Sequence, residues 1–202
     1  MTADPLPLPG LGFPDRGEQL ALLGEARPVR ISAELWQRWL TDEKILHRFE
    51  TKRYVRETMS CWPWIGAISS TGHGSFRAAS LPGQSRRGTV PAHMFAYQLV
   101  NGIIPRLGWA ATDDATLCHQ CDYAGCTNPA HMRLGNNATN RAEYDLRRRN
   151  LRSPLADVRG AAGRSHAIAA AVRDGLAAGE DRAAIDARVA AAEAAGVPFT
   201  LW

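Results

Sequence analysis

The sequence of 202 residues predicts an α+β fold on three observations. Apolar residues recur at helical spacing in segments 31–49 and 165–195. The polar, glycine-containing stretch 69–74 lies between apolar and aromatic residues, which predicts a β-hairpin. Segment 116–149 has the pattern of a strand, a loop, a second strand and a helix. The chain therefore combines a small β-structure with helices on both sides of it in the sequence.

The upstream elements have recognisable start and stop signals. Ser32 is a candidate N-cap for the helix expected over 31–49. Strand pairing beside the hairpin would bring Trp62 or Trp64 to the core. A short helix is expected over 92–100, started by a proline and stopped by an Asn-Gly pair.

The central and C-terminal elements follow in order. Strands are predicted at 116–121 and 131–134, and a helix at 137–149. The Ala-rich segment breaks at Gly179, and Asp181 can cap a second helix, which predicts a C-terminal α-helical hairpin.

Composition divides the chain into three parts. Residues 1–29 are rich in proline and glycine and are expected to form a flexible leader. Residues 30–152 hold the predicted core, and residues 153–202 form an Ala-rich helical extension. We expect a cytoplasmic protein, bacterial or phage-encoded, because the N-terminus lacks a continuous apolar run and no segment reaches membrane-spanning length.

Positive charge is concentrated in one region of the chain. The whole sequence carries a formal charge of only +4, which is weak evidence for a nucleic-acid partner. Residues 61–164 hold twelve arginines and six acidic residues, whereas residues 165–202 hold three and five. Any contact with phosphate groups is therefore expected in the central region.

A candidate metal site lies in the same region. Cys121, Cys126 and His131 have C-x4-C-x4-H spacing, and zinc is the ion that takes thiolate and imidazole ligands together. Cys61 and Cys118 both compete for the fourth position, although a strand would place residues 118 and 121 on opposite faces. The C-x-x-C spacing of those two cysteines is also found in redox proteins, but there it begins a helix.

His119 lies two residues before the first cysteine of this run. It would be a redundant ligand if a distant cysteine completes the zinc site. A histidine held beside a metal site but left unbound is a candidate general base, because a neutral imidazole can accept a proton from water.

The central region resembles the His-Cys box and HNH group of ββα-metal (His-Me finger) endonucleases, of the phage or mobile-element type. The resemblance covers about three-fifths of the chain, residues 31–150. The residues that carry it are His119, Cys121, Cys126, Asn128, Pro129, His131 and Asn140, with Cys61, Trp62, Trp64, His73 and His93 upstream.

This resemblance implies a ββα-metal core, a structural Zn2+ bound by Cys61 with the three local ligands, and an endonuclease acting on double-stranded DNA. His119 would be the base, Asn140 would hold one catalytic Mg2+, and Asn128 would orient the site. The products would carry 5′-phosphate and 3′-hydroxyl ends.

One departure from the family leaves other functions open. Met94 stands where the family usually has arginine after the histidine, so a catalytically inactive, zinc-stabilised DNA-binding module is the main alternative. A nuclease acting on RNA is a third.

Several further residues are candidates for contact with DNA. His93 could reach a phosphate, whereas His73 is expected to be exposed to solvent in the hairpin turn. The candidate arginines are Arg77, Arg86 and Arg87 upstream, and Arg141, Arg147 and Arg148 after the box.

The C-terminal extension has its own candidate partners. Its helices could dock on the core or form a homodimer. The apolar tail 198–202 loosely resembles the short sliding-clamp-binding tails of DNA-replication proteins, without their usual glutamine.

Overall fold

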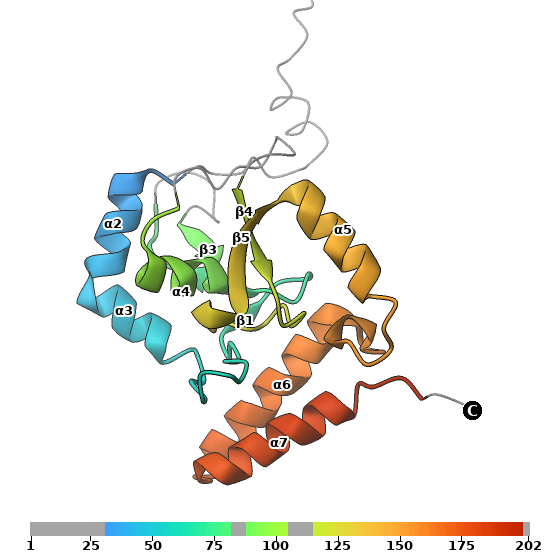
Figure 1. The fold of residues 1–202 in the computed structure, drawn as a ribbon. Coiled ribbons are helices and arrows are strands. Elements are labelled where there is room, and N and C mark those ends of the chain that lie inside the picture. The colour runs from blue at the N-terminus through green and yellow to red at the C-terminus, as the bar shows by residue number, and fades with distance from the viewer. Residues whose placement is uncertain (1–30, 82–87, 105–114, 200–202) are drawn as a thin grey trace, which may run out of the picture. The chain divides into compact units, whose positions relative to one another are not determined.

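The computed structural model describes residues 31–81, 88–104 and 115–199. The described residues belong to one compact unit of mixed α+β structure (Figure 1). The predicted leader, residues 1–29, lies outside the described residues. None of the described helices is both long enough and apolar enough to cross a membrane.

The first described segment forms two helices, α2 (Ala33–Thr41) and α3 (Glu43–Glu50). Ser32 caps α2 as predicted, because its side chain accepts a hydrogen bond from the Leu35 amide. The expectation of a single helix over 31–49 was wrong. Asp42 adopts an extended backbone conformation, and its carboxylate accepts the amide of Ile45, so it ends one helix and caps the next.

The predicted hairpin is confirmed as part of a three-stranded antiparallel sheet. Its strands are β1 (Ala67–Ile68), β2 (Gly74–Arg77) and β3 (Thr89–Pro91), in that order across the sheet. The helix α4 (Ala92–Asn101) follows directly, with Pro91 at its N-cap, as the sequence predicts.

An aromatic core joins this sheet to the helices around it. Phe49 of α3 contacts Trp64, Phe76 and Phe95, with ring centroids 4.6 to 5.4 Å apart. Trp64 is completely buried, and its indole N–H donates to the Ala67 carbonyl oxygen. Burial of these rings holds the hairpin and α4 in fixed positions.

The central order of strand, loop, strand and helix is also present. The strands β4 (Ala115–His119) and β5 (Met132–Asn136) pair antiparallel, and α5 (Asn137–Arg147) follows. The short 3-10 helix η1 (Pro129–His131) ends the loop between the strands. The first strand ends at His119, two residues earlier than predicted, which leaves Cys121 on the loop.

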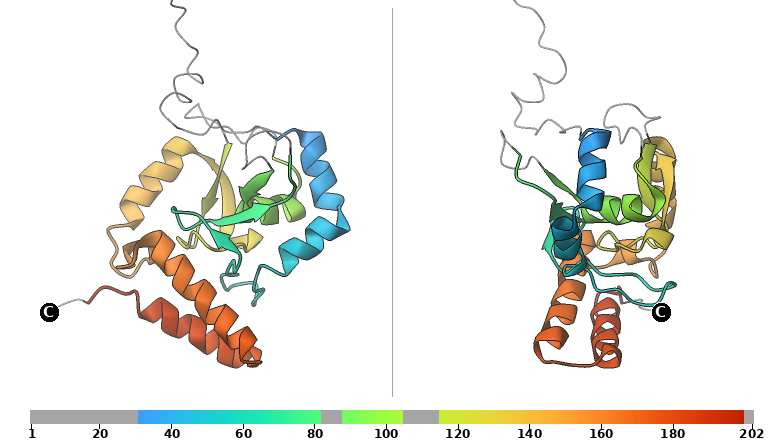
Figure 2. Two further views of the ribbon diagram at one scale, coloured as in Figure 1. Left: turned by 180° about the vertical axis from the view of Figure 1, so that it is seen from behind. Right: turned by 90° about the vertical axis from the view of Figure 1, so that its left-hand side faces the viewer.

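The chain continues through a second 3-10 helix, η2 (Pro154–Ala156), to the predicted helical hairpin. It consists of α6 (Gly160–Ala177) and α7 (Arg182–Ala194), and Asp181 caps α7 as expected. The two helices lie side by side in both views of Figure 2. They do not form a separate core, because Ile168 and Val172 pack in one buried cluster with Tyr123 and Cys126.

Candidate metal centre and active site

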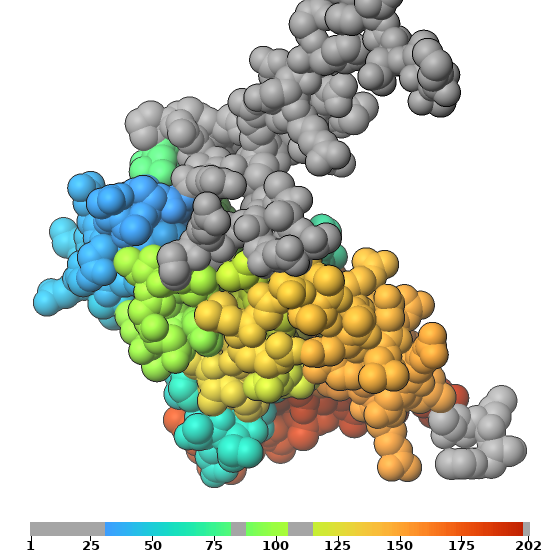
Figure 3. All heavy atoms as spheres, turned by 45° about the horizontal axis from the view of Figure 1, so that its top comes forward, coloured from blue at the N-terminus to red at the C-terminus, as the bar shows by residue number. Residues whose placement is uncertain are grey.

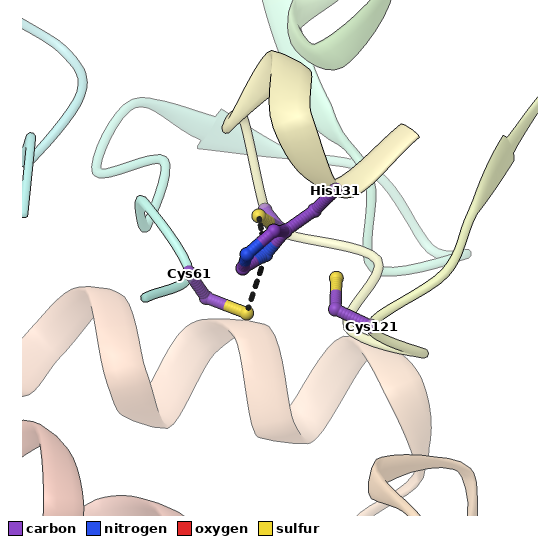
Figure 4. Close-up of side chains that lie close together, drawn as sticks. Cys61, Cys121 and His131 are labelled. Carbon is purple, nitrogen blue, oxygen red and sulfur yellow. Dashed lines mark hydrogen bonds between the residues drawn. The ribbon is translucent and has the colours of Figure 1, made fainter. Parts of the chain in front are cut away.

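Four side chains that can bind a metal converge beneath the loop between β4 and β5. Cys61, Cys121, Cys126 and His131 each offer a ligand atom, and these four atoms lie within 4.8 Å of one another. Figure 4 shows Cys61, Cys121 and His131 pointing toward one another above the helix α6. The cluster is the one that the sequence and its resemblance predicted, with Cys61 as the fourth member.

Two distances from His131 match tetrahedral zinc. Nδ1 of His131 lies 3.5 Å from Sγ of Cys61 and 3.7 Å from Sγ of Cys126. Thiolate and imidazole ligands at their usual zinc distances and a tetrahedral angle are about 3.5 Å apart. The residues present therefore fit a zinc ion in a closed site, with no position left for a reactant.

The protonation of the thiols gives a second reason for a cation. The pKa of Cys121 falls to about 2, because the thiols of Cys126 and Cys61 hydrogen-bond to its sulfur. The pKa of Cys61 rises to about 12, chiefly through its hydrogen bond to Cys121, and burial raises the pKa of Cys126. The three thiols thus compete for protons, and a divalent ion bound between them would let all three ionise.

Cys118 lies elsewhere. It points from β4 toward α5, where its thiol is close to Gly135 and donates weakly to the Thr116 carbonyl oxygen. It is buried, and burial raises the pKa of its thiol. Period-2 alternation along β4 places it on the opposite face from His119. Cys118 is not among the side chains that converge on the cluster.

Asn128 links the two chain segments that supply the ligands. Its buried side-chain amide donates to the carbonyl oxygens of Thr58 and Ser60 at 2.7 and 2.8 Å, immediately before Cys61. Its own N–H donates to the sulfur of Cys126. This arrangement gives Asn128 a structural role; it makes no hydrogen bond to His119 among the described residues.

His119 is oriented by the same loop, but through a backbone atom. Its Nε2 lies 3.1 Å from the carbonyl oxygen of Cys126. A carbonyl oxygen can only accept, so this nitrogen carries the proton and Nδ1 keeps its lone pair. Cys126 therefore has two roles: its sulfur belongs to the candidate metal cluster, and its carbonyl oxygen fixes the tautomer of His119. The second role depends on a backbone atom, so no pattern of residue types could have indicated it.

Two further histidines lie beside His119. The ring centroid of His93, on α4, is 4.7 Å from that of His119, and the centroid of His73 is 5.7 Å away. The prediction that His73 is solvent-exposed was wrong: burial lowers its pKa to about 4, and the pKa of His93 is also lowered by burial. Both imidazoles are therefore neutral at neutral pH. Only the fold could show this, because three separate elements supply the three rings.

Asn140 lies on α5 with a half-exposed side chain. It shares a helix face with Glu143 and Arg147, at i+3 and i+7, and Arg147 donates to the carbonyl oxygen of His119. The side chain of Asn140 makes no hydrogen bond to any other described residue, so its amide oxygen is available. No direct contact joins it to His119 in the described part of the chain.

The candidate DNA-contacting arginines fall into different environments. Arg147 is engaged by Asp122 and Glu143 and supports the end of β4. Arg141 and Arg148 have side chains that are 79% and 57% exposed, each beside Asp145. Arg77 is exposed at the end of β2.

Other sequence-based candidates are only partly described. Arg86 and Arg87 lie outside the described residues, as does the end of the tail from residue 200. Phe199, the last described residue, is fully exposed.

The metal centre predicts the zinc content of two cysteine variants. We expect one tightly bound zinc per purified chain, at most a small residual amount in Cys61→Ser, and one zinc in Cys118→Ser, because only Cys61 belongs to the cluster. Elemental analysis of the purified proteins measures this. Zinc retained by Cys61→Ser and lost from Cys118→Ser would contradict the assignment.

The link made by Asn128 predicts a loss of stability in Asn128→Ala. The carbonyl oxygens of Thr58 and Ser60 would lose the donor that the buried Asn128 side chain supplies, so the free energy of unfolding should fall by about 2–4 kcal/mol. Urea unfolding measures it, with Asn101→Ala as the matched control, since Asn101 is exposed at the end of α4. Equal stability of the two variants would show that the link is unimportant.

Comparison of the chain with protein-family models, with curated proteins and with solved structures gave no match. The chemistry of the site is therefore argued from its own geometry: a Cys3His cluster that fits zinc, and a histidine oriented by the loop that carries it.

Proposed function

We propose that the chain is a metal-dependent DNA endonuclease of the HNH or His-Cys box type, which hydrolyses double-stranded DNA with His119 as the general base. The observation that carries this proposal is the 3.1 Å hydrogen bond from His119 to the carbonyl oxygen of Cys126. It ties a histidine with a free basic nitrogen to a loop that a zinc ion would hold rigid. A zinc-stabilised binding module would have no need of such a contact.

The base would act on a water molecule in line with the scissile phosphate. Nδ1 of His119 has the lone pair, and the carbonyl of Cys126 would stabilise the imidazolium formed when it takes the proton. His93 and His73 lie against the same ring, and both are neutral there. Because these two neighbours are uncharged, they do not repel the positive charge that His119 gains when it takes the proton.

Asn140 is the residue proposed to bind the catalytic cation. One Mg2+ held by its amide oxygen and by DNA oxygens would neutralise charge on the departing 3′ oxygen. Asn140 is chosen on the resemblance and because its side-chain amide has no described hydrogen-bond partner. Arg147, on the same face of α5, reaches only the backbone carbonyl oxygen of His119, whose ring lies on the other side of β4. Cleavage in this way leaves 5′-phosphate and 3′-hydroxyl ends.

DNA would be bound along α5. The helix has no buried residue, and Figure 3 shows its surface, in orange, open on one face of the molecule. Arg141 and Arg148 project from it with mostly exposed side chains. Contacts of this kind give affinity without sequence preference and weaken with salt.

One observation favours the alternative, a zinc-stabilised DNA-binding module without catalysis. Met94 packs against the aromatic core in the position where related endonucleases usually have arginine. No cation from this position can therefore stabilise charge on the phosphate, so that such a contact would have to come from Arg77, Arg86 or Arg87, or be missing.

The proposal predicts the nicking activity of four proteins. Supercoiled plasmid should be nicked by the wild type when Mg2+ is added and not when it is omitted. His119→Ala should be slower by roughly 10²- to 10⁴-fold, the usual contribution of a general base. Asn140→Ala should also be slow and should recover partly at high Mg2+, whereas His47→Ala, an exposed control, should match the wild type.

Mg2+ is omitted here instead of chelated, because a chelator would also remove structural zinc. Nicking by His119→Ala at the wild-type rate would defeat the catalytic assignment. Retardation of DNA on a gel without nicking by any of the four proteins would favour the binding module.

A further inference from the structure

Three histidines from three separate elements meet on the side of β4 away from α5. His73 comes from the turn before β2, His93 from α4 and His119 from the end of β4. One nitrogen of each lies within 4.8 Å of the other two. The chain has six histidines, and the remaining three are a member of the Cys3His cluster and the exposed His47 and His166.

The arrangement of the rings suits a shared ion better than it suits stacking. The centroid separations are 5.0, 5.7 and 4.7 Å, and the planes are inclined by 44°, 38° and 57°. Three imidazoles bound to one ion at zinc distances and tetrahedral angles have centroids about 5 Å apart. Small rotations of the side chains would bring the nitrogens onto a common centre.

Hydrogen bonds outside the cluster prepare two of the rings for this role. Nε2 of His119 donates to the carbonyl oxygen of Cys126, which directs Nδ1 elsewhere. Nδ1 of His73 lies 2.9 Å from the hydroxyl of Thr71, which is itself 2.9 Å from that of Ser69. Histidines that bind metals commonly hold their second nitrogen in this way.

The third ring, that of His93, has a nitrogen without a partner. His93 is only 7% exposed, and its Nδ1 is buried without a hydrogen bond. A buried polar nitrogen left unpaired destabilises the folded chain. A ligand bound by the cluster would remove that cost, which is independent evidence that something binds there.

We propose that His73, His93 and His119 form a second metal site, selective for a borderline transition-metal ion such as Zn2+ over Mg2+. Three imidazoles suit such ions, whereas Mg2+ requires oxygen ligands. The three protein ligands leave one position open to water or to a phosphate oxygen, unlike the closed Cys3His site.

Occupancy of this site has a consequence that rests on the proposed nuclease function. The lone pair of His119 cannot bind an ion and accept a proton at the same time. Zn2+ bound by the three histidines would therefore inhibit cleavage, so that the free concentration of the ion controls the enzyme.

The binding experiment uses the full chain with its structural zinc in place. Added Co2+ should bind at one further ion per chain by equilibrium dialysis, without the thiolate-to-cobalt absorption that would mark exchange into the Cys3His site. His73→Ala and His93→Gln should bind at least tenfold more weakly while keeping one zinc, which shows that they are folded. His47→Ala should behave as the wild type.

Failure of the wild type to bind a further ion, or equal binding by His73→Ala, would overturn the second site. A separate nicking assay tests inhibition: in Mg2+, added Zn2+ should slow the wild type, and His73→Ala should need at least tenfold more Zn2+ for the same effect. Equal inhibition of the two proteins would contradict the competition for His119. If neither protein nicks DNA, the proposed function fails, and the binding result still decides the second site.

Discussion

The candidate site depends on the convergence of two chain segments about sixty residues apart onto one metal position. Cys61 arrives from the segment before the hairpin, and the other three ligands come from the loop between β4 and β5. Asn128 holds the segments together by donating to two backbone carbonyls just before Cys61. A zinc ion would add four bonds to that link, and a loop without regular secondary structure would become rigid.

The loop that carries the candidate metal cluster contacts the rest of the chain in two directions. Toward the C-terminus, Cys126 and Tyr123 pack against Ile168 and Val172, so the helical hairpin covers the metal site and belongs to the same core. Toward β4, the carbonyl oxygen of Cys126 fixes the imidazole of His119. Cys126 therefore belongs to the candidate metal cluster, packs in the core and orients the candidate base. The α5 helix also contacts this histidine, because Arg147 donates a hydrogen bond to the backbone carbonyl oxygen of His119.

Local patterns in the sequence predicted most of the fold, including the hairpin, α4, the β4 to α5 order and the C-terminal helices. Capping chemistry at Asp42 could have revealed the break between α2 and α3, since aspartate is a strong N-cap. Strand alternation, which separates residues 118 and 121, argued against Cys118, but Cys61 itself could be chosen only from a resemblance, because long-range pairing leaves no mark on local spacing. The place of His73 beside two other histidines, and the backbone contact made by Cys126, depend on tertiary structure alone.

The central claim is that zinc bound by three sulfurs and one nitrogen fixes the loop that orients His119. X-ray absorption at the zinc edge of the purified full chain tests it most directly. The account predicts three sulfur neighbours at about 2.3 Å and one nitrogen at about 2.0 Å. A shell dominated by oxygen or nitrogen, or one with four sulfurs, would contradict it.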